Sequence, residues 1–274
     1  MIPMKCVPII MGSKGDLNYA REIGKRLKGV EPVYRIASAH KTTKFALDLM
    51  AELDAAGDVL AYIPVAGRSN GLGPVVAGNT RKPVVTSPPL GEDMGAFFLD
   101  LPSSLRMPSD LPLVTAVGPE AAADFVNGIA KLCQGDKIPV AFGVIPRVYA
   151  DAVEKKLQGL SVVPVDPLSM VQGEQRVGII FGNPAEYTPP FKYPTIFCFE
   201  EMKELLYAGI THPEVIMDKT IKGKCFVMEP RNAALAAANI AALKDPALRG
   251  RLDEYYRKVQ KDIMEADREL RGVE

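Results

Sequence analysis

The sequence lacks a net charge, because Lys and Arg total 33 and Asp and Glu also total 33. No basic field is present to draw the chain to nucleic acid or to an anionic membrane, so a small-molecule partner is the better expectation. Apolar runs approaching the ~20 residues that a membrane helix needs are also absent. So is a basic segment followed by an apolar one at the start of the sequence. We therefore expect a cytoplasmic protein that is neither secreted nor inserted in a membrane.

Cysteine is scarce, and no CxxC pair occurs. The four cysteines are Cys6, Cys133, Cys198 and Cys225. This wide spacing indicates neither a zinc site nor a disulfide framework. Cysteine ranks among the most buried residue types, so we expect buried free thiols in a reducing compartment.

The chain has 274 residues, of which 47% are hydrophobic, enough for one large core or two small ones. In its first part, short apolar runs alternate with segments of helical spacing. The predicted strands are 7–11, 32–36, 59–65 and 83–86, and the predicted helices are 19–27 and 45–53. This alternation predicts an α/β fold of three αβα layers around a parallel sheet, flavodoxin-like or Rossmann-like, with right-handed crossovers.

The second part of the chain resembles the first. Pro119 and Pro230 each open an alanine-rich helical pattern, and Pro83 and Pro194 each head a β-like run; the members of each pair lie 111 residues apart. These matches predict a tandem repeat, although two unrelated α/β halves would also share alanine-rich helices. We expect a catalytic domain at 1–135, a degenerate repeat at 136–245 and a C-terminal helix at 246–274.

The second part lacks the polar residues of the first. No histidine stands at its counterpart of residues 38–41, and Gly182-Asn183-Pro184 replaces the loop that begins at Gly67. We therefore expect a scaffold without chemistry of its own. The last helix, expected at 246–270, carries an apolar stripe that packs on its own domain or on a partner subunit. The stripe consists of Leu248, Leu252, Tyr255, Tyr256, Val259 and Ile263.

A first polar loop, Gly12-Ser13-Lys14-Gly15-Asp16, follows the first strand and opens a helix. Free backbone N–H groups at a helix start can receive a phosphate, and Ser13 adds a hydroxyl donor. Asp16 repels phosphate but can accept hydrogen bonds from ribose hydroxyls. The alternative is a tight turn in which Ser13 or Asp16 is the helix N-cap. Neither GxGxxG nor GxxxxGK[ST] occurs, which argues against dinucleotides and nucleoside triphosphates.

A second loop, Ser38-Ala39-His40-Lys41, holds one of only two histidines in the chain. An imidazole with an ordinary pKa of ~6.5 can accept and donate a proton near neutrality, and Lys41 offers a cation for phosphate. Ser38 could equally be a helix N-cap beside a bystander histidine. The other histidine, His212, stands in a proline turn where a surface role is expected.

A third loop, residues 67–74, is rich in glycine yet includes Arg68, Ser69 and Asn70. Backbone and side chains could both approach a ligand there, whereas a plain glycine-rich connection has little use for an arginine and an amide. A further arginine, Arg106, follows two serines in the motif 103–109. Because ligands bind beyond the carboxyl ends of parallel strands, we expect the first three loops to converge on one rim of the sheet.

Six motifs stand in the order and spacing of one enzyme family. They lie at residues 11–16, 38–41, 66–74, 78–80, 87–89 and 103–109. Together they resemble class II PurE, the phosphoribosylaminoimidazole carboxylases, over about residues 5–134. The related class I enzymes are mutases and typically carry Ala-Ala-His-Leu-Pro-Gly where this chain has Arg68-Ser69-Asn70-Gly71-Leu72-Gly73. The tail from Glu229 onward also resembles a PurE carboxyl terminus.

The resemblance implies ATP-independent carboxylation of 5-aminoimidazole ribonucleotide by CO2, a lyase reaction of purine biosynthesis, with His40 as catalytic base. It implies no metal or organic cofactor and a homo-oligomer. The implied substrate-binding residues are Gly12, Ser13, Asp16, Ser38, Ala39, Lys41, Gly67, Arg68, Ser69, Asn70, Gly71 and Leu72. The family often has serine where Gly15 stands. Two alternatives are a mutase that uses N5-carboxyaminoimidazole ribonucleotide and a non-catalytic nucleotide-binding regulator.

Overall fold

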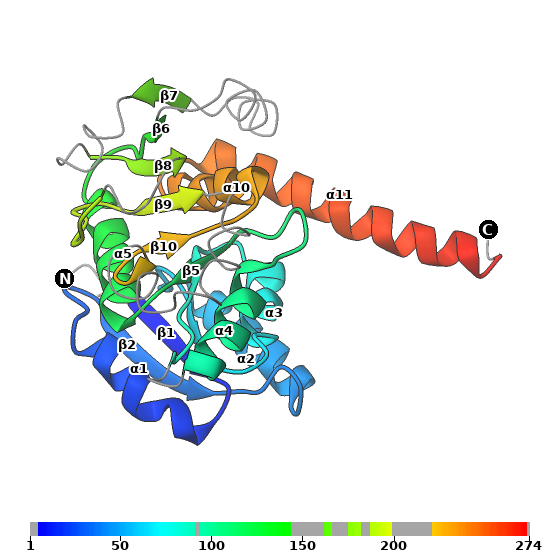
Figure 1. Cartoon of the computed structure of the whole chain (residues 1–274). Coiled ribbons are helices and arrows are strands. Elements are labelled where there is room, and N and C mark those ends of the chain that lie inside the picture. The colour runs from blue at the N-terminus through cyan, green and yellow to red at the C-terminus, as the bar shows by residue number, and fades with distance from the viewer. Residues whose placement is uncertain are drawn as a thin grey trace.

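The computed structural model describes residues 5–90, 94–143, 162–165, 175–181, 187–198 and 221–272. Strands run through the body of the molecule with helices packed on their faces (Figure 1). The predicted α/β class is therefore confirmed. The region around His212 and the segment Gly182–Pro184 lie outside the described residues.

The first half builds a five-stranded parallel arrangement. Its strands are β1 (Cys6–Met11), β2 (Glu31–Ile36), β3 (Ile63–Val65), β4 (Val84–Thr86) and β5 (Leu113–Ala116). The order β2-β1-β3 continues into β4-β5 through a parallel bridge between Tyr62 and Val84. The resulting order 2-1-3-4-5 is that of flavodoxin-like folds, in which ligands bind at the carboxyl ends of the strands.

Helices follow these strands and cover both faces of the sheet. They are η1 (Lys14–Asp16), α1 (Leu17–Gly24), α2 (Thr43–Ala56), α3 (Leu72–Asn79), α4 (Met94–Leu105) and α5 (Pro119–Leu132). The alanine-rich α5 packs with α1 in one core cluster, and α2 and α3 pack in a second one. The helix expected at 19–27 starts and ends a little earlier, and the strand expected at 59–65 is regular only in its last three residues.

The described strands of the second half show the same order as the first. They are β6 (Val140–Gly143), β7 (Val162–Val165), β8 (Val177–Phe181), β9 (Thr195–Cys198) and β10 (Cys225–Phe226). Counted within this half, the order β7-β6-β8-β9-β10 is again 2-1-3-4-5. Pairing is parallel within each half, but β10 pairs antiparallel to β5, a departure from the parallel sheet expected. Thr115 lies opposite Phe226, the residue 111 positions further along the chain.

The two halves share one hydrophobic core. Helix α10 (Pro230–Ala241) is buried along its alanine-rich length, and it packs in the same cluster as α1 and α5. Alanine side chains let these helices approach the sheet closely. A further cluster joins Leu101 and Leu105 of α4 to the second half, where the rings of Phe197 and Phe226 lie 5.8 Å apart. The sheet and its helices therefore form a single body (Figure 1).

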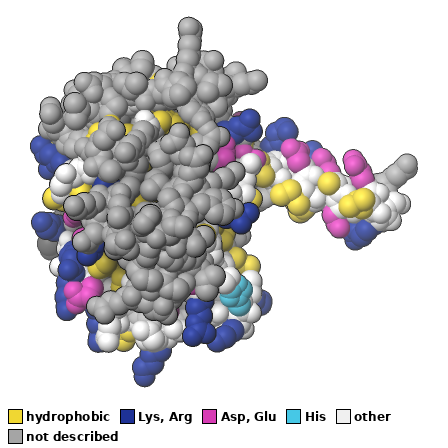
Figure 2. Space-filling view, in the orientation of Figure 1, with side chains coloured by type: hydrophobic (Ala, Val, Ile, Leu, Met, Phe, Trp, Pro, Cys, Tyr) yellow, Lys and Arg dark blue, Asp and Glu magenta, His cyan; other side chains and the backbone are white. Residues whose placement is uncertain are grey.

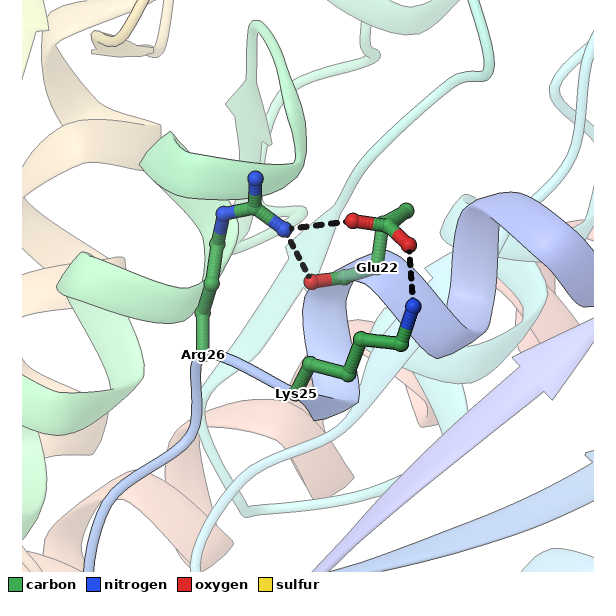
Figure 3. Close-up of polar contacts among 3 residues, drawn as sticks. All are labelled: Glu22, Lys25 and Arg26. Carbon is green, nitrogen blue, oxygen red and sulfur yellow. Dashed lines mark hydrogen bonds and ion pairs between the residues drawn. The ribbon is translucent and has the colours of Figure 1, made fainter.

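The end of α1 is joined to α5 by polar contacts. Arg26 donates to the carboxylate of Glu22 at 2.9 Å and Lys25 donates to it at 2.6 Å (Figure 3). These cations lower the pKa of Glu22, Lys25 most, but exposed pairs add little stability. Asn127 of α5 accepts a bond from the backbone N–H of Lys28 and donates to the carbonyl of Arg26. These two hydrogen bonds of Asn127 hold α5 against the segment that follows α1.

The last helix, α11 (Pro246–Leu270), begins where predicted and projects from the body (Figure 1). Asp245 caps it by accepting a bond from the Leu248 N–H at 2.9 Å. The predicted stripe is buried only in the first half of the helix, at Leu248, Leu252 and Tyr256, whereas Ile263 is 67% exposed. Figure 2 shows hydrophobic side chains on the projecting part.

Three of the four cysteines, Cys6, Cys198 and Cys225, are buried free thiols as predicted, and Cys133 is a half-buried one. Burial raises the pKa of the Cys6 thiol to about 11, with a contribution from Asp58. Among the described residues, none of the helices combines the length and the apolar character that crossing a membrane requires.

Candidate active site

The polar loops follow the strands of the first half at their carboxyl ends. The first begins directly after β1, the second follows β2 and the third follows β3. Hydrogen bonds tie the strand ends together, because the Gly12 N–H donates to the carbonyl of Val65 and the Ala37 N–H donates to that of Met11, both at 2.9 Å. The first three sequence motifs therefore lie on one rim of the sheet, as the strand pattern predicts.

In the first loop, Asp16 folds back onto Ser13. Its Oδ2 atom accepts hydrogen bonds from the backbone N–H of Ser13 at 2.9 Å and from its hydroxyl at 3.0 Å. Ser13 is the N-cap of η1, as the alternative interpretation expected, and its side chain is also exposed at the rim. Gly15 has space beside it, since a Cβ there would lie 3.4 Å from the Ser13 hydroxyl.

The second loop is a compact turn ahead of α2. The Ser38 hydroxyl accepts from the Lys41 N–H at 3.2 Å, and the Ser38 N–H donates to the Thr42 hydroxyl at 3.0 Å. The N-cap of α2 is Thr42 and not Ser38, so the helix begins later than the N-cap alternative expected. Ala39 packs at the edge of the second core cluster. The turn holds His40 and Lys41 exposed on the rim.

The imidazole of His40 lies against the backbone of the third loop. A Cβ atom on Gly71 would overlap Nε2 and would also lie 3.0 Å from Cε1. Glycine is therefore required at position 71 for His40 to occupy this place. This contact brings the histidine of the second loop together with the arginine- and serine-bearing loop.

The third loop presents some side chains and buries others. Arg68 is exposed and adopts a left-handed backbone with φ of 63°, and Ser69 is exposed beside it. Gly67 packs near Pro89, where a Cβ would lie 3.6 Å from the proline ring. Leu72 is buried in the second core cluster, so its side chain belongs to the core.

Asn70 is turned inward and is 4% exposed. Its amide nitrogen donates to the hydroxyls of Thr86 at 3.1 Å and Ser104 at 3.0 Å, and its oxygen accepts from the Gly73 N–H at 3.0 Å. Both amide hydrogens are thus used within the protein. Its amide thus holds the third loop against α4 and β4, and its contact with a substrate stays a prediction.

Sequence reasoning missed the residues of α4 that support this loop. The Ser103 hydroxyl donates to the Arg68 carbonyl at 3.2 Å and accepts from the Asn70 N–H at 3.4 Å. Asp100 is 8% exposed, and its Oδ2 would lie 3.4 Å from a Cβ on Gly67. The pair of serines at 103 and 104 could have indicated this support from the sequence. In that motif Arg106 was singled out instead.

A buried hydrogen bond links α1 to the loop after β4. The Tyr19 hydroxyl lies 2.9 Å from the Ser87 hydroxyl. Burial raises the pKa of Tyr19 to about 12. The helix that follows Ser13 is therefore held against the strand that supports Asn70 through Thr86.

A family model described as AIR carboxylase matches residues 6–136. A phosphoribosylaminoimidazole carboxylase from Treponema denticola is 37% identical over 119 residues, which cover 43% of this chain and 74% of that protein. One from Archaeoglobus fulgidus is 43% identical over 122 residues, covering 44% of this chain and 65% of that protein. A crystal structure of Treponema denticola PurE matches with a TM-score of 0.42 and 33% identity, covering 47% of this chain and 79% of that chain.

Multifunctional animal proteins also match part of the chain. A probable multifunctional protein ADE2 from Caenorhabditis elegans is 45% identical over 122 residues. The match covers 43% of this chain and 28% of the nematode protein. The chain thus spans less than a third of such relatives.

Proposed function

This chain belongs to the AIR carboxylase family, and from that premise we propose that it carboxylates 5-aminoimidazole ribonucleotide with CO2, without ATP. The product is 4-carboxy-5-aminoimidazole ribonucleotide, an intermediate of purine biosynthesis. The observation that carries the proposal is the place of His40, whose imidazole lies against Gly71 in the loop that bears Arg68 and Ser69.

The chemistry requires one base. The imidazole C4 of the substrate is an enamine-type carbon, and its electron pair forms a bond to the carbon of CO2. C4 is then tetrahedral and carries both the new carboxylate and its original hydrogen. His40 takes that proton, and the electrons of the C–H bond restore the aromatic ring. General-base assistance of this kind is worth ~10²–10⁴ in rate.

The three loops bind the different parts of the substrates. Ser13 and Lys41 bind the 5′-phosphate, supported by the backbone at the start of η1. Asp16, which accepts two bonds from Ser13, exchanges part of this bonding for a ribose hydroxyl. The exposed Arg68 and Ser69 receive CO2 and the nascent carboxylate. Asn70 holds their loop in place through Thr86 and Ser104.

The second half is proposed to be a degenerate copy of the first. Support comes from the strand order 2-1-3-4-5 in both halves and from the pairing of Thr115 with Phe226, which are related by the same 111-residue shift as the sequence motifs. The chain is proposed to act in the cytoplasm as a homo-oligomer that binds neither nucleic acid nor membrane. The exposed apolar residues of α11 support the oligomer.

The reaction is tested by incubating the purified chain with aminoimidazole ribonucleotide and bicarbonate in the absence of ATP. We expect the carboxylated nucleotide to form, at a rate that rises with the CO2 concentration. Product from N5-carboxyaminoimidazole ribonucleotide alone would instead make the chain a mutase. Binding of the nucleotide without turnover of either compound would make it a regulator.

The role of His40 is tested by His40→Asn, which keeps a hydrogen-bonding side chain but cannot take a proton near neutrality. We expect kcat to fall by at least ~10²-fold while nucleotide affinity, measured by calorimetry, changes only several-fold. Lys44→Gln is the matched control, because Lys44 pairs with Asp48 on the exposed side of α2 and its loss leaves turnover unchanged. Near-normal turnover by His40→Asn would remove His40 from the mechanism.

A further inference from the structure

A cavity of ≈ 680 Å³ opens at the other end of α3 from the catalytic loop. Helix α3 starts directly after Gly71 and ends at Asn79, where the chain turns to line this cavity. We call it the α11 pocket, because one wall is the first half of α11. Its charged lining residues are Asp54, Arg81, Lys82, Arg249, Asp253 and Arg257.

The positive charges of the α11 pocket come from two separate segments. Arg81 and Lys82 lie in the connection between α3 and β4, while Arg249 and Arg257 lie two steps of four residues apart on α11. Residues at such spacing lie on one side of a helix. The fold thus directs four cations into one concave surface.

Both carboxylates of the pocket are already engaged. Asp253 pairs with Arg81 at 3.4 Å. Asp54 accepts hydrogen bonds at 2.8 Å from the hydroxyls of Tyr62 and Thr80. Lys82, Arg249 and Arg257 form no ion pair with any residue that the structure describes. Four cations and two carboxylates line the pocket, so it has an excess of positive charge.

The surroundings of Lys82 disfavour its charged form. Its ammonium is half-buried, and burial first, then Arg249 and Lys5, lower the pKa of Lys82, while the carboxylates of Asp54 and Asp58 act in the opposite direction. An anion in the pocket would oppose these effects by pairing with Lys82 and the two arginines. Arg81 and Lys82 are partly buried while Arg249 and Arg257 are exposed, and a concave cluster of such cations is suited to bind phosphate groups.

We propose that the α11 pocket binds a small phosphorylated metabolite, a ligand with at least two negative charges on phosphate oxygens. The volume lies within the range of small-molecule sites. The arginines supply forked donors for phosphate oxygens, and Lys82 supplies a point charge. The chain has no net charge, so this positive surface is a local feature of the pocket.

The probe for this site is inorganic pyrophosphate, titrated calorimetrically into the full chain at low ionic strength. Two variants remove the cations, Lys82→Gln alone and Arg249→Gln with Arg257→Gln. We expect each to weaken pyrophosphate binding at least tenfold. Arg249 also donates to the Ala242 carbonyl at the end of α10, so its replacement could impair folding. Lys82→Gln keeps the test valid in that case. The matched control is Arg251→Gln with Arg268→Gln, which removes the same charge from α11 outside the pocket and leaves affinity within twofold.

Because the catalytic loops also have groups for phosphate, each titration is repeated with Lys41→Gln present. We expect a pyrophosphate site that survives Lys41→Gln and is weakened by Lys82→Gln. Binding that disappears with Lys41→Gln, or that falls equally in the control, would overturn the proposal. So would a shift to smaller species in sedimentation of the pocket variants, because the pocket would then be a contact between copies. Neither result depends on turnover of aminoimidazole ribonucleotide.

Discussion

At the scale of single residues, the site depends on side chains that are small or turned inward. Gly71 leaves room for the imidazole of His40. The amide of Asn70 donates to Thr86 and Ser104 and accepts from the Gly73 N–H. Both decide where the residues with chemistry stand, and a misplacement of about 1 Å can cost ~10² in rate.

Gly71→Ala tests the placement of His40. The new methyl group overlaps the imidazole, so we expect kcat/KM to fall about 10²-fold while the free energy of unfolding changes by less than about 1 kcal/mol. Gly78→Ala on the same helix is the control, because its Cβ would lie at an ordinary 3.7 Å from Leu111. Equal activity of the two variants in steady-state assays would show that His40 does not need this position.

Asn70→Ala tests the support of the third loop. It leaves the buried Gly73 N–H without its acceptor, and we expect the free energy of unfolding to fall by ~1–3 kcal/mol in urea denaturation. Asn79→Ala, at the exposed end of α3, should change it by less than ~0.5 kcal/mol. If Asn70→Ala abolished substrate binding without loss of stability, Asn70 would be a ligand after all.

At the scale of elements, α11 has two parts with different surroundings. Its first half packs in the main core through Leu248, Leu252 and Tyr256, and the Arg81 guanidinium lies 4.3 Å from the centroid of the Tyr256 ring. Its second half projects with Ile263 67% and Met264 55% exposed. The proposed homo-oligomer would use these exposed apolar residues as a subunit contact.

Ile263→Ser with Met264→Ser tests this surface. We expect a smaller assembly in sedimentation velocity, because the contact loses apolar area. Lys258→Ser with Asp262→Ser removes an exposed ion pair from the opposite side of the helix and should leave the assembly intact. Identical sedimentation of both double variants and the parent chain would contradict a subunit contact through α11.

At the scale of the whole molecule, the catalytic half is not a free-standing unit. Its strand β5 pairs with β10, and its helix α5 shares a core with α10. A Cβ on Gly128 of α5 would come within 2.8 Å of the Pro194 ring, so the halves touch closely. A shared core predicts cooperative unfolding.

Phe226→Ala tests this cooperativity. Phe226 is 1% exposed and packs between the halves, so we expect a loss of ~3–5 kcal/mol in the free energy of unfolding. Hydrogen exchange followed by mass spectrometry should show β1 and β8 losing protection together. Early exchange of β8 while β1 stays protected would mean that the halves unfold separately.

The sequence by itself determined four of the five strands of the first half, its helices α1, α2 and α5, the last helix, and the rim on which His40, Ser13 and Arg68 gather. Apolar periodicity and the position of loops after strands are local properties, so they can be read along the chain. The 111-residue shift likewise predicts a repeat, and the proposal of a degenerate second copy rests on it together with the strand order.

Only the tertiary structure decided which polar side chains face outward. Asn70 and Arg68 stand two residues apart in one loop, yet one is buried against α4 and the other is exposed. Only the tertiary structure likewise decided three further features: the antiparallel pairing of β5 with β10, the place of His40 over Gly71 and the gathering of cations in the α11 pocket. Each depends on contacts between segments distant in the chain, which local patterns do not encode.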